Sequence, residues 1–301
     1  MATLEKEKRQ EKIKIQEQVE KPVSPWKDAW RSFKKNKIAL IGAIIVLLFV
    51  VVAILAPWIM PYDYNKNDLV NRLQPPTGDH WLGTDDFGRD ILSRSMYGAR
   101  ISLTVGFSAV LGSIIIGSFL GVVAAYYGRW VDTLISRIFD ILLAFPSILL
   151  AIAIVAILGP SLRNALIAIA IINIPNFGRL IRSRVLSVKE EEYIVAARAV
   201  GMNDSRILIR HIIPNSITPV IVQGTLAIAT AIIEIAALSF LGLGAQSPKV
   251  DWGKMLADSQ QYLVNAPWTM IFPGVAIMLT VLGFNLMGDG LRDALDPKMK
   301  S

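Results

Sequence analysis

The sequence predicts an all-α membrane protein with six transmembrane helices and both termini in the cytoplasm. Of its 301 residues, 53% are apolar and only 18% are charged, whereas about a quarter of a typical soluble domain is charged. The apolar residues form long blocks, and the basic residues between these blocks are unevenly distributed. Together these three observations indicate a chain that spans a bilayer several times.

The first apolar block covers 38–59 and contains no charged residue. It is long enough to cross a hydrocarbon core of about 30 Å. It is too long for the apolar region of a signal peptide, and no small-residue cleavage site follows it. We therefore expect an uncleaved membrane helix, with five further spans at 101–127, 138–158, 164–181, 216–241 and 268–288.

Glycines and prolines punctuate these blocks. Gly112, Gly117 and Gly121 recur at near-helical spacing in the second span. Small residues let membrane helices approach closely, so the row predicts a packing face. Pro146 and Pro175 lie inside predicted spans, where a proline is tolerated if neighbouring groups satisfy the freed carbonyls. We expect both spans to continue through their prolines.

The loops indicate the orientation. If the N-terminus is inside, the inner loops and C-terminal tail carry 12 basic residues against 8 outside, even without the N-terminal tail. Arg31, Lys34, Lys35 and Lys37 directly precede the first span and favour the cytoplasmic side. Anionic lipid accounts for the net charge of +7, so we expect no nucleic-acid partner. The polar tail 1–37 is predicted to be partly disordered.

The longest inner loop has its own helical pattern. The stretch 192–200 predicts a helix that Gly201 ends. Residues 203–205 are N-cap candidates for a second helix ending near Pro214. Small alanines and a mixture of basic and apolar side chains suit docking into a groove. The alternative is a solvated loop between spans, but such a loop does not need this pattern.

A dense charged turn precedes the second span. It contains Asp85, Asp86, Arg89 and Asp90, and Arg94 follows Asp90 at the i,i+4 spacing of a helical ion pair. Two interpretations stay open. The turn pins an amphipathic helix at the outer interface, or it contacts a ligand directly.

Two tryptophans flank the last outer loop. Trp252 lies within it, and Trp268 begins the sixth span. Amphipathic aromatic rings settle at membrane–water interfaces, so both side chains are expected there. Trp252 is accordingly assigned, together with the charged turn, to the extracytoplasmic face.

Polar residues inside the spans are few. Glu234 is the clearest ionisable one, and Asn173, Gln223 and Asn285 are weaker candidates of the same kind. An ionisable group in a span usually faces protein or a water-filled cavity rather than lipid. Lining a translocation path and hydrogen-bonding a neighbouring helix both fit these four residues.

The inner loop resembles the EAA loop of permeases in ATP-binding-cassette importers, with the pattern Glu-Ala-Ala, three residues, Gly, nine residues, Ile-x-Leu-Pro. Aligning on Gly201 places Ala196, Ala197 and Pro214 at matching positions. The departures are Val195 for the Glu, His211 for the Ile and Ile213 for the Leu. The resemblance implies a coupling helix that sits in a cleft of an ATPase. The residues implied in coupling are Glu192, Tyr193, Ala196, Ala197, Arg198, Gly201, Arg210, His211 and Pro214.

Three other segments resemble the C-type transmembrane subunit of dipeptide and oligopeptide (and nickel) permeases. They are HWLGTDDFGRDILSRSMYGARISL, LSFLGLGAQSPKVDWGKM and NLMGDGLRDALDP, in this order. The resemblance covers about 26–299 and implies the type I importer permease fold. It divides the chain into a cytoplasmic tail 1–37, a first helix and extracytoplasmic segment 38–100, a five-helix core 101–290 with the coupling loop 183–215, and a C-terminal tail 291–301.

By this resemblance, the chain forms half of a path for peptides in a bacterial or archaeal cell membrane. The implied partners are a B-type permease in a heterodimer, two ATPase subunits and an extracytoplasmic binding protein. The chain has no G-x-x-x-x-G-K-[ST] loop, so ATP and Mg²⁺ are expected on the ATPases. No cofactor, metal site or catalytic residue is expected on this chain, and it is not expected to be an enzyme.

Two alternatives remain. Within the family, the transported solute could be a nickel chelate or another small molecule, and a homodimer could replace the heterodimer. From another class, the chain could be an autonomous ion-coupled carrier or channel. Such proteins commonly carry several paired intramembrane charges or an inverted repeat, and neither is evident here.

Overall fold

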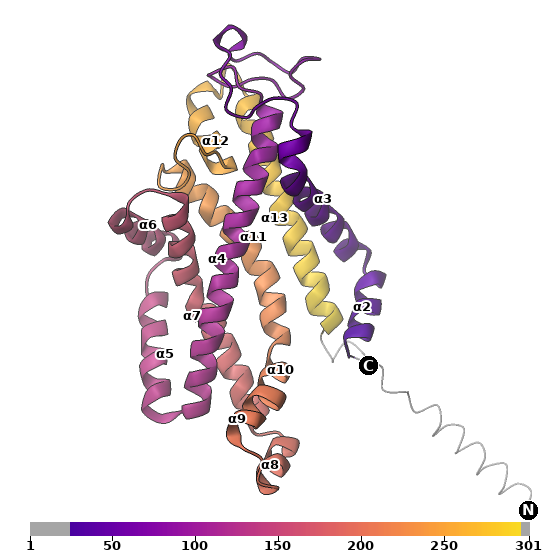
Figure 1. The fold of residues 1–301 in the computed structure, drawn as a ribbon, viewed down its shortest axis with the longest axis vertical. Helices are drawn as coiled ribbons and strands as arrows, with labels where there is room; N and C mark the ends of the chain where they lie inside the picture. Colours follow the sequence, from indigo (N-terminus) through magenta and orange to yellow (C-terminus); the bar gives the residue numbers. More distant parts are fainter. Residues whose placement is uncertain (1–24, 296–301) are drawn as a thin grey trace, which may run out of the picture.

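The computed structural model describes residues 25–295 as an elongated bundle of helices (Figure 1). Within this range the regular elements are all helical, and a single isolated bridge joins Thr84 to Asp90. The rest of the predicted N-terminal tail, 1–24, and residues 296–301 lie outside the described residues.

The bundle has two distinct ends (Figure 1). The segment between the first two spans, with the short helix η1 (Leu69–Asn71), lies at one end beside α12 (Trp252–Ser259) and η3 (Gln260–Tyr262). The helices α8 (Glu192–Ala199) and α9 (Asp204–Ile207) project at the opposite end. The bundle therefore presents a separate structure on each side of its long helices.

Five helices are long and apolar enough to cross a membrane, which confirms five of the predicted spans. The second span is longer than predicted and begins at Ile91, because the Asp90 carboxylate accepts the amide of Ser93 at 2.8 Å and caps the helix. The five helices are α3 (Lys37–Ile59), α4 (Ile91–Tyr127), α7 (Leu162–Lys189), α11 (Thr218–Phe240) and α13 (Trp268–Leu295).

The predicted third span, 138–158, is not one continuous helix. It is divided between α5 (Arg129–Leu143) and α6 (Ser147–Leu158), which meet at 93°. The break falls at Pro146, which has no amide hydrogen and disfavours the helical conformation in the residue before it. The expectation that this span continues through its proline was therefore wrong, whereas α7 does continue through Pro175.

Glycines bring α4 and α7 into close contact. A Cβ at Gly117 would lie 2.6 Å from the carbonyl oxygen of Ile174, and one at Gly121 would overlap the carbonyl oxygen of Gly178. Gly178 in turn lies against the ring of Phe139 from α5. The predicted packing face is confirmed at Gly117 and Gly121. A Cβ at Gly112 would have its nearest neighbour 3.8 Å away, so this glycine is not needed for the contact.

The last part of the predicted tail is a helix, α2 (Pro25–Lys35). Its Phe33 is buried with Ala39 of α3 and Ala294 of α13. Asn36 forms the junction, since its side-chain oxygen accepts the amides of Ile38 and Ala39 at 3.1 Å each. The chain thus turns from α2 into the first span through one capping residue.

We predict that Gly121→Ala destabilises the protein. The added methyl group would overlap a backbone carbonyl of α7, which cannot move without separating the two helices. Overpacking of this kind costs about 1–3 kcal/mol. A lower thermal denaturation midpoint of the purified protein in detergent is the expected result.

The matched control is Gly112→Ala in the same helix. Here the methyl group meets only ordinary van der Waals distances, and removing a glycine from a helix interior gains roughly 0.5–1 kcal/mol. Equal midpoints for the two variants would contradict the close α4–α7 contact.

Candidate functional site

The segment after α7 folds into a compact projection. Helix α8 ends at Ala199 with Val200 as its C-cap, and Gly201 follows with a φ of +79°, a left-handed conformation that favours glycine. Asn203 then caps α9, its side-chain oxygen accepting the amide of Ser205 at 3.0 Å. The two predicted short helices, and the glycine that separates them, are confirmed. We call residues 190–216 the coupling segment.

The coupling segment has an anchored face and a free face. Ile194, Ile207 and Ile212 are fully buried in the main hydrophobic core of the bundle. Burying three isoleucines fixes the projection to the bundle, because each contributes about 1.5–3 kcal/mol. Most residues assigned to coupling are exposed in this chain, and these are Glu192, Tyr193, Ala196, Arg198, Gly201, Arg210 and Pro214.

The two alanines of the segment have different surroundings. Ala196 is exposed, whereas Ala197 is half-buried and packs against the chain's own core. The carbonyl of Ala197 also accepts the amide of Met202, which ties the turn to α8. Ala196 is therefore free to contact another protein, and Ala197 holds the projection together.

The second helix of the segment ends at Ser216, two residues after Pro214, as predicted, but it is not regular. A π-helical turn, η2 (Leu208–Ile212), follows α9, and the amide of Ile213 donates to the carbonyl of Leu208. The helix then continues as α10 (Ile213–Ser216). Pro214 lies in the first turn of α10, where a missing amide hydrogen is tolerated.

His211 lies inside this π-helical turn. Its ring centroid is 6.4 Å from that of Tyr193, which connects α8 to η2. The side chain is half-buried, and its Nε2 atom is buried without a hydrogen-bond partner. His211 therefore packs within the coupling segment and offers less surface to a partner than the exposed residues do.

A polar centre lies inside the bundle. Asn173 of α7 is buried, and its side-chain nitrogen donates to the Ile169 carbonyl at 3.0 Å and reaches a Glu234 carboxylate oxygen of α11 at 3.5 Å. Ser147, at the start of α6, also lies near the Glu234 carboxylate. The polar centre thus involves residues of three helices. Asn173 and Glu234 were each predicted from the sequence, but Ser147 was missed, because its only signal was its place after Pro146.

The other two candidates in the spans are exposed in this chain. Gln223 lies eleven residues before Glu234, so it shares the same face of α11 three helical turns away. Thr230 lies between them on this face and is also exposed. Asn285 lies on α13, which packs against α11. Gln223 and Thr230 therefore extend the polar face of Glu234 along α11, and Asn285 belongs to another helix.

The charged turn at the opposite end centres on Asp85. One carboxylate oxygen accepts the amides of Phe87 and Arg89 at 2.9 and 3.0 Å. The other accepts Nε of Arg89 at 2.7 Å and Nε of the buried Arg94 at 3.2 Å. Asp86 forms a longer ion pair with Arg89, at 3.5 Å. Burial, and then the neighbouring Asp85 carboxylate, raise the pKa of Asp86.

The predicted Asp90–Arg94 pair does not form. Asp90 instead caps α4 through Ser93, and its second oxygen lies 3.0 Å from Nδ1 of His80. Because Asp90 caps the helix, Arg94 pairs with Asp85 instead. The role of His80 was missed, because the loop that returns it to Asp90 has no regular pattern in the sequence.

Trp252 is fully buried, so its predicted place at the membrane interface was wrong. Its indole N–H donates to the Ser95 carbonyl at 3.0 Å, and its ring meets that of Phe49 edge to face at 5.8 Å. The neighbouring Asp251 is also buried, caps α12 and accepts the hydroxyl of Ser239 at 2.5 Å. Desolvation raises the pKa of Asp251. These contacts attach the last outer loop to α4 and α11.

The family of the chain follows from residues 113–301, which match the binding-protein-dependent transport system inner membrane component. The chain belongs to this permease family. Residues 24–76 also match the N-terminal transmembrane domain of oligopeptide transport permease C. The permease is thus a transport subunit and a multi-pass protein of the bacterial inner membrane.

Relatives match the permease over nearly its whole length. The dipeptide transport system permease protein DppC of Alkalihalophilus pseudofirmus is 64% identical over 279 residues, covering 93% of this chain and 92% of the relative. The glutathione transport system permease protein GsiD of Pectobacterium atrosepticum is 49% identical, covering 92% and 93%. These are similarities of sequence to proteins named for peptide transport.

Solved structures share the fold at low identity. A chain of the inward-facing MetNI methionine ABC transporter aligns with a TM-score of 0.56 and 19% identity, over 68% of the permease and 96% of that chain. A chain of an amino acid ABC transporter aligns with a TM-score of 0.51 and 16% identity, over 66% and 91%. The predicted importer permease fold is confirmed.

We predict that Asp85→Asn destabilises the charged turn strongly. The amide would keep the shape of the side chain but lose both ion pairs, leaving the buried Arg94 without its carboxylate. Breaking a buried pair by removing one partner costs about 3–5 kcal/mol. Faster limited proteolysis between residues 60 and 90 of the purified permease is the expected result.

Asp86→Asn is the control, because it removes one long contact to Arg89 only. Proteolysis of this variant should proceed as in the wild type. If the two variants are cleaved at the same rate, Asp85 is not the centre of the turn.

Proposed function

We propose that this permease forms half of the path through which an ATP-binding-cassette importer moves di- or oligopeptides into the cell. In this proposal a B-type permease completes the path, two separate ATPase subunits bind ATP and Mg²⁺, and an extracytoplasmic protein delivers the peptide. The observation that carries the proposal is the coupling segment, a projection fixed by buried isoleucines with an exposed face toward a partner.

The exposed face has the properties of a protein-binding surface. Tyr193 and Ile209 are 44% and 67% exposed in this chain, and Val200 is 80% exposed. Apolar side chains exposed together on one projection are typical of a surface that another protein covers. Arg198 and Arg210 lie among them and suit a polar rim around an apolar centre. An ATPase cleft is the partner that the family's transport systems supply.

The position of the coupling segment supports a route for transmission. It continues directly from α7 and leads through α10 into α11. Asn173 lies on α7, and Glu234 lies on α11. Displacing the segment would therefore change the relation between the helices that hold the polar centre. Such coupling requires the ATPases to bind the segment with different free energies in their nucleotide states.

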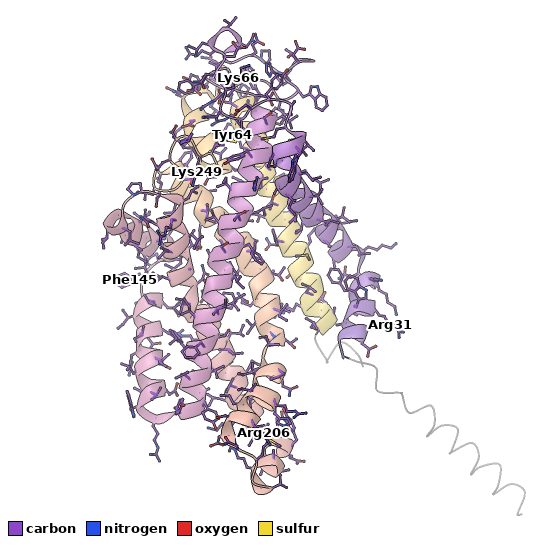
Figure 2. The ribbon with its side chains drawn as sticks, viewed as in Figure 1. Arg31, Tyr64, Lys66, Phe145, Arg206 and Lys249 are labelled. Atoms are coloured by element: carbon purple, nitrogen blue, oxygen red, sulfur yellow. The ribbon has the colours of Figure 1, made fainter. Side chains whose placement is uncertain are left out.

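The orientation is proposed from the distribution of charge and the two ends of the bundle. Arg31 lies toward the end that carries Arg206, and Lys66 lies at the opposite end (Figure 2). The basic residues around α2 directly precede the first span, where positive charge favours the cytoplasm. Both termini and the coupling segment are accordingly cytoplasmic, and the charged turn is extracytoplasmic.

The choice of peptides rests on the names of the relatives. One is named for dipeptides and another for glutathione, which is itself a peptide. Nickel chelates and other small solutes remain the second candidate within the family. In either case the polar face of Gln223, Thr230 and Glu234 is the part of α11 that would face a path, because polar groups in spans avoid lipid.

We predict that Ala196→Trp removes the ATPase subunits from the affinity-purified complex and abolishes ATP-dependent dipeptide uptake in liposomes. An indole in place of the exposed methyl group would hold the coupling segment away from a close partner surface. Co-purified ATPase is measured by mass spectrometry, and uptake is measured with labelled dipeptide, binding protein and ATP.

Val264→Trp is the control, because it adds the same indole to a fully exposed residue of the last outer loop. It should retain the ATPases. Uptake of a nickel chelate but not of the dipeptide would show that the transported solute is not a peptide. Uptake without ATP would show that the protein is an autonomous carrier or channel.

We also predict opposite labelling of single cysteines at the two ends. The natural sequence contains no cysteine, so each introduced thiol is the only one on this chain. In intact spheroplasts, Lys66→Cys should react with a membrane-impermeant maleimide, and Arg206→Cys should react only after the membrane is opened. Both residues are exposed, so neither change should disturb folding. The reverse pattern would invert the proposed orientation.

A further inference from the structure

Helix α2 has a seated face and a free face. Ala29 and Phe33, one turn apart, are buried. Phe33 packs against Ala39 and Ala294, and Leu291 adds to this contact. The helix is therefore held against the ends of α3 and α13, and its orientation about its own axis is fixed by this contact.

The free face combines an aromatic ring with positive charge. Trp30 is 56% exposed and stacks on Phe33, with ring centroids 5.9 Å apart and an interplanar angle of 7°. Nζ of Lys34 lies 4.9 Å from the centroid of the Trp30 ring. Arg31 and Lys35 are also exposed. The tryptophan is thus held rigidly, with cations around it.

The first span sets the depth of these side chains relative to the membrane. Asn36 ends the junction, and Lys37 begins α3, whose exposed apolar residues start at Ile38. The basic residues of α2 therefore lie at the depth where hydrocarbon gives way to lipid headgroups. Asp28, in the first turn, is the one acidic residue of α2, and no Asp or Glu occurs between residues 29 and 60, so the four cations at 31, 34, 35 and 37 leave this stretch positively charged.

We propose that α2 is an interfacial helix that binds the phosphates of anionic phospholipids, with Trp30 at the boundary of headgroups and acyl chains. Clusters of four or more Lys and Arg beside a span attract anionic lipid, and a tryptophan on an amphipathic helix settles at this depth. Charge complementarity favours lipid over protein as the partner of the free face of α2. A protein partner would have to cover a fixed tryptophan and four cations at the plane of the membrane surface.

Bound lipid would also act on the bundle. Phe33 connects α2 to the ends of the first and last spans, and a Cβ at Gly290 of α13 would overlap Ala39 of α3 and lie 3.4 Å from the Phe33 ring. The three helices therefore meet without space between them. Anionic lipid that holds α2 at the membrane surface would hold this corner of the permease at a fixed depth.

The test is photocrosslinking in the intact importer. Ser32→benzoylphenylalanine places the crosslinker on the exposed part of α2. The complex is reconstituted in nanodiscs of phosphatidylcholine, with and without phosphatidylglycerol, and crosslinked lipid is identified by mass spectrometry. We expect phosphatidylglycerol to be captured well above its share of the bilayer. Combining Arg31→Gln, Lys34→Gln and Lys35→Gln should lower this capture about tenfold or more.

The matched control combines Lys66→Gln, Arg163→Gln and Lys249→Gln, which removes the same charge from exposed residues elsewhere. Capture of phosphatidylglycerol should not change. Raising the salt concentration should lower the capture in the wild type, because exposed charges are screened. Crosslinking mainly to a protein subunit, or to both lipids in proportion to their abundance, would overturn the proposal. Neither readout depends on which solute is transported.

Discussion

The close contact between α4 and α7 is the interaction on which the rest of the bundle depends. In a bilayer the hydrophobic effect does not drive helices together. Close packing instead depends on small residues, which let the two backbones approach each other. Gly117, Gly121 and Gly178 supply that approach. Because α4 runs from the charged turn to the opposite end, and α7 runs into the coupling segment, this one contact joins both functional ends of the permease.

Most of the fold could be predicted from the sequence because the bilayer limits what an apolar block can become. Without water, backbone groups must be satisfied within the segment, so each long block forms a helix. The predictions that failed concern single positions whose structure depends on tertiary contacts. The span breaks at Pro146, and the next residue, Ser147, lies near Glu234 of a helix far along the chain. The sequence alone could not show that Pro146 ends a helix while Pro175 does not.

The candidate site was predictable in its pattern but not in its orientation. The glycine and the capping residues of the coupling segment act locally, so their positions alone located both short helices. The way the segment docks on the core decides which alanine faces inward. The alanine that packs against the core is Ala197. Likewise, Trp252 has the composition of an interface residue, but the packing of α4 and Phe49 encloses it. Burial of this kind follows from contacts between residues far apart in the chain.

Hydrogen–deuterium exchange tests most directly whether residues 190–214 bind the ATPase subunits. Short surface helices such as α8 open readily, so their amides exchange faster than those of the spans unless a partner covers them. Exchange is compared between the intact complex and the permease stripped of its ATPases. We expect protection to be lost in 192–210 and unchanged in 60–90. Unchanged exchange in 192–210, with loss of protection elsewhere, would contradict the claim.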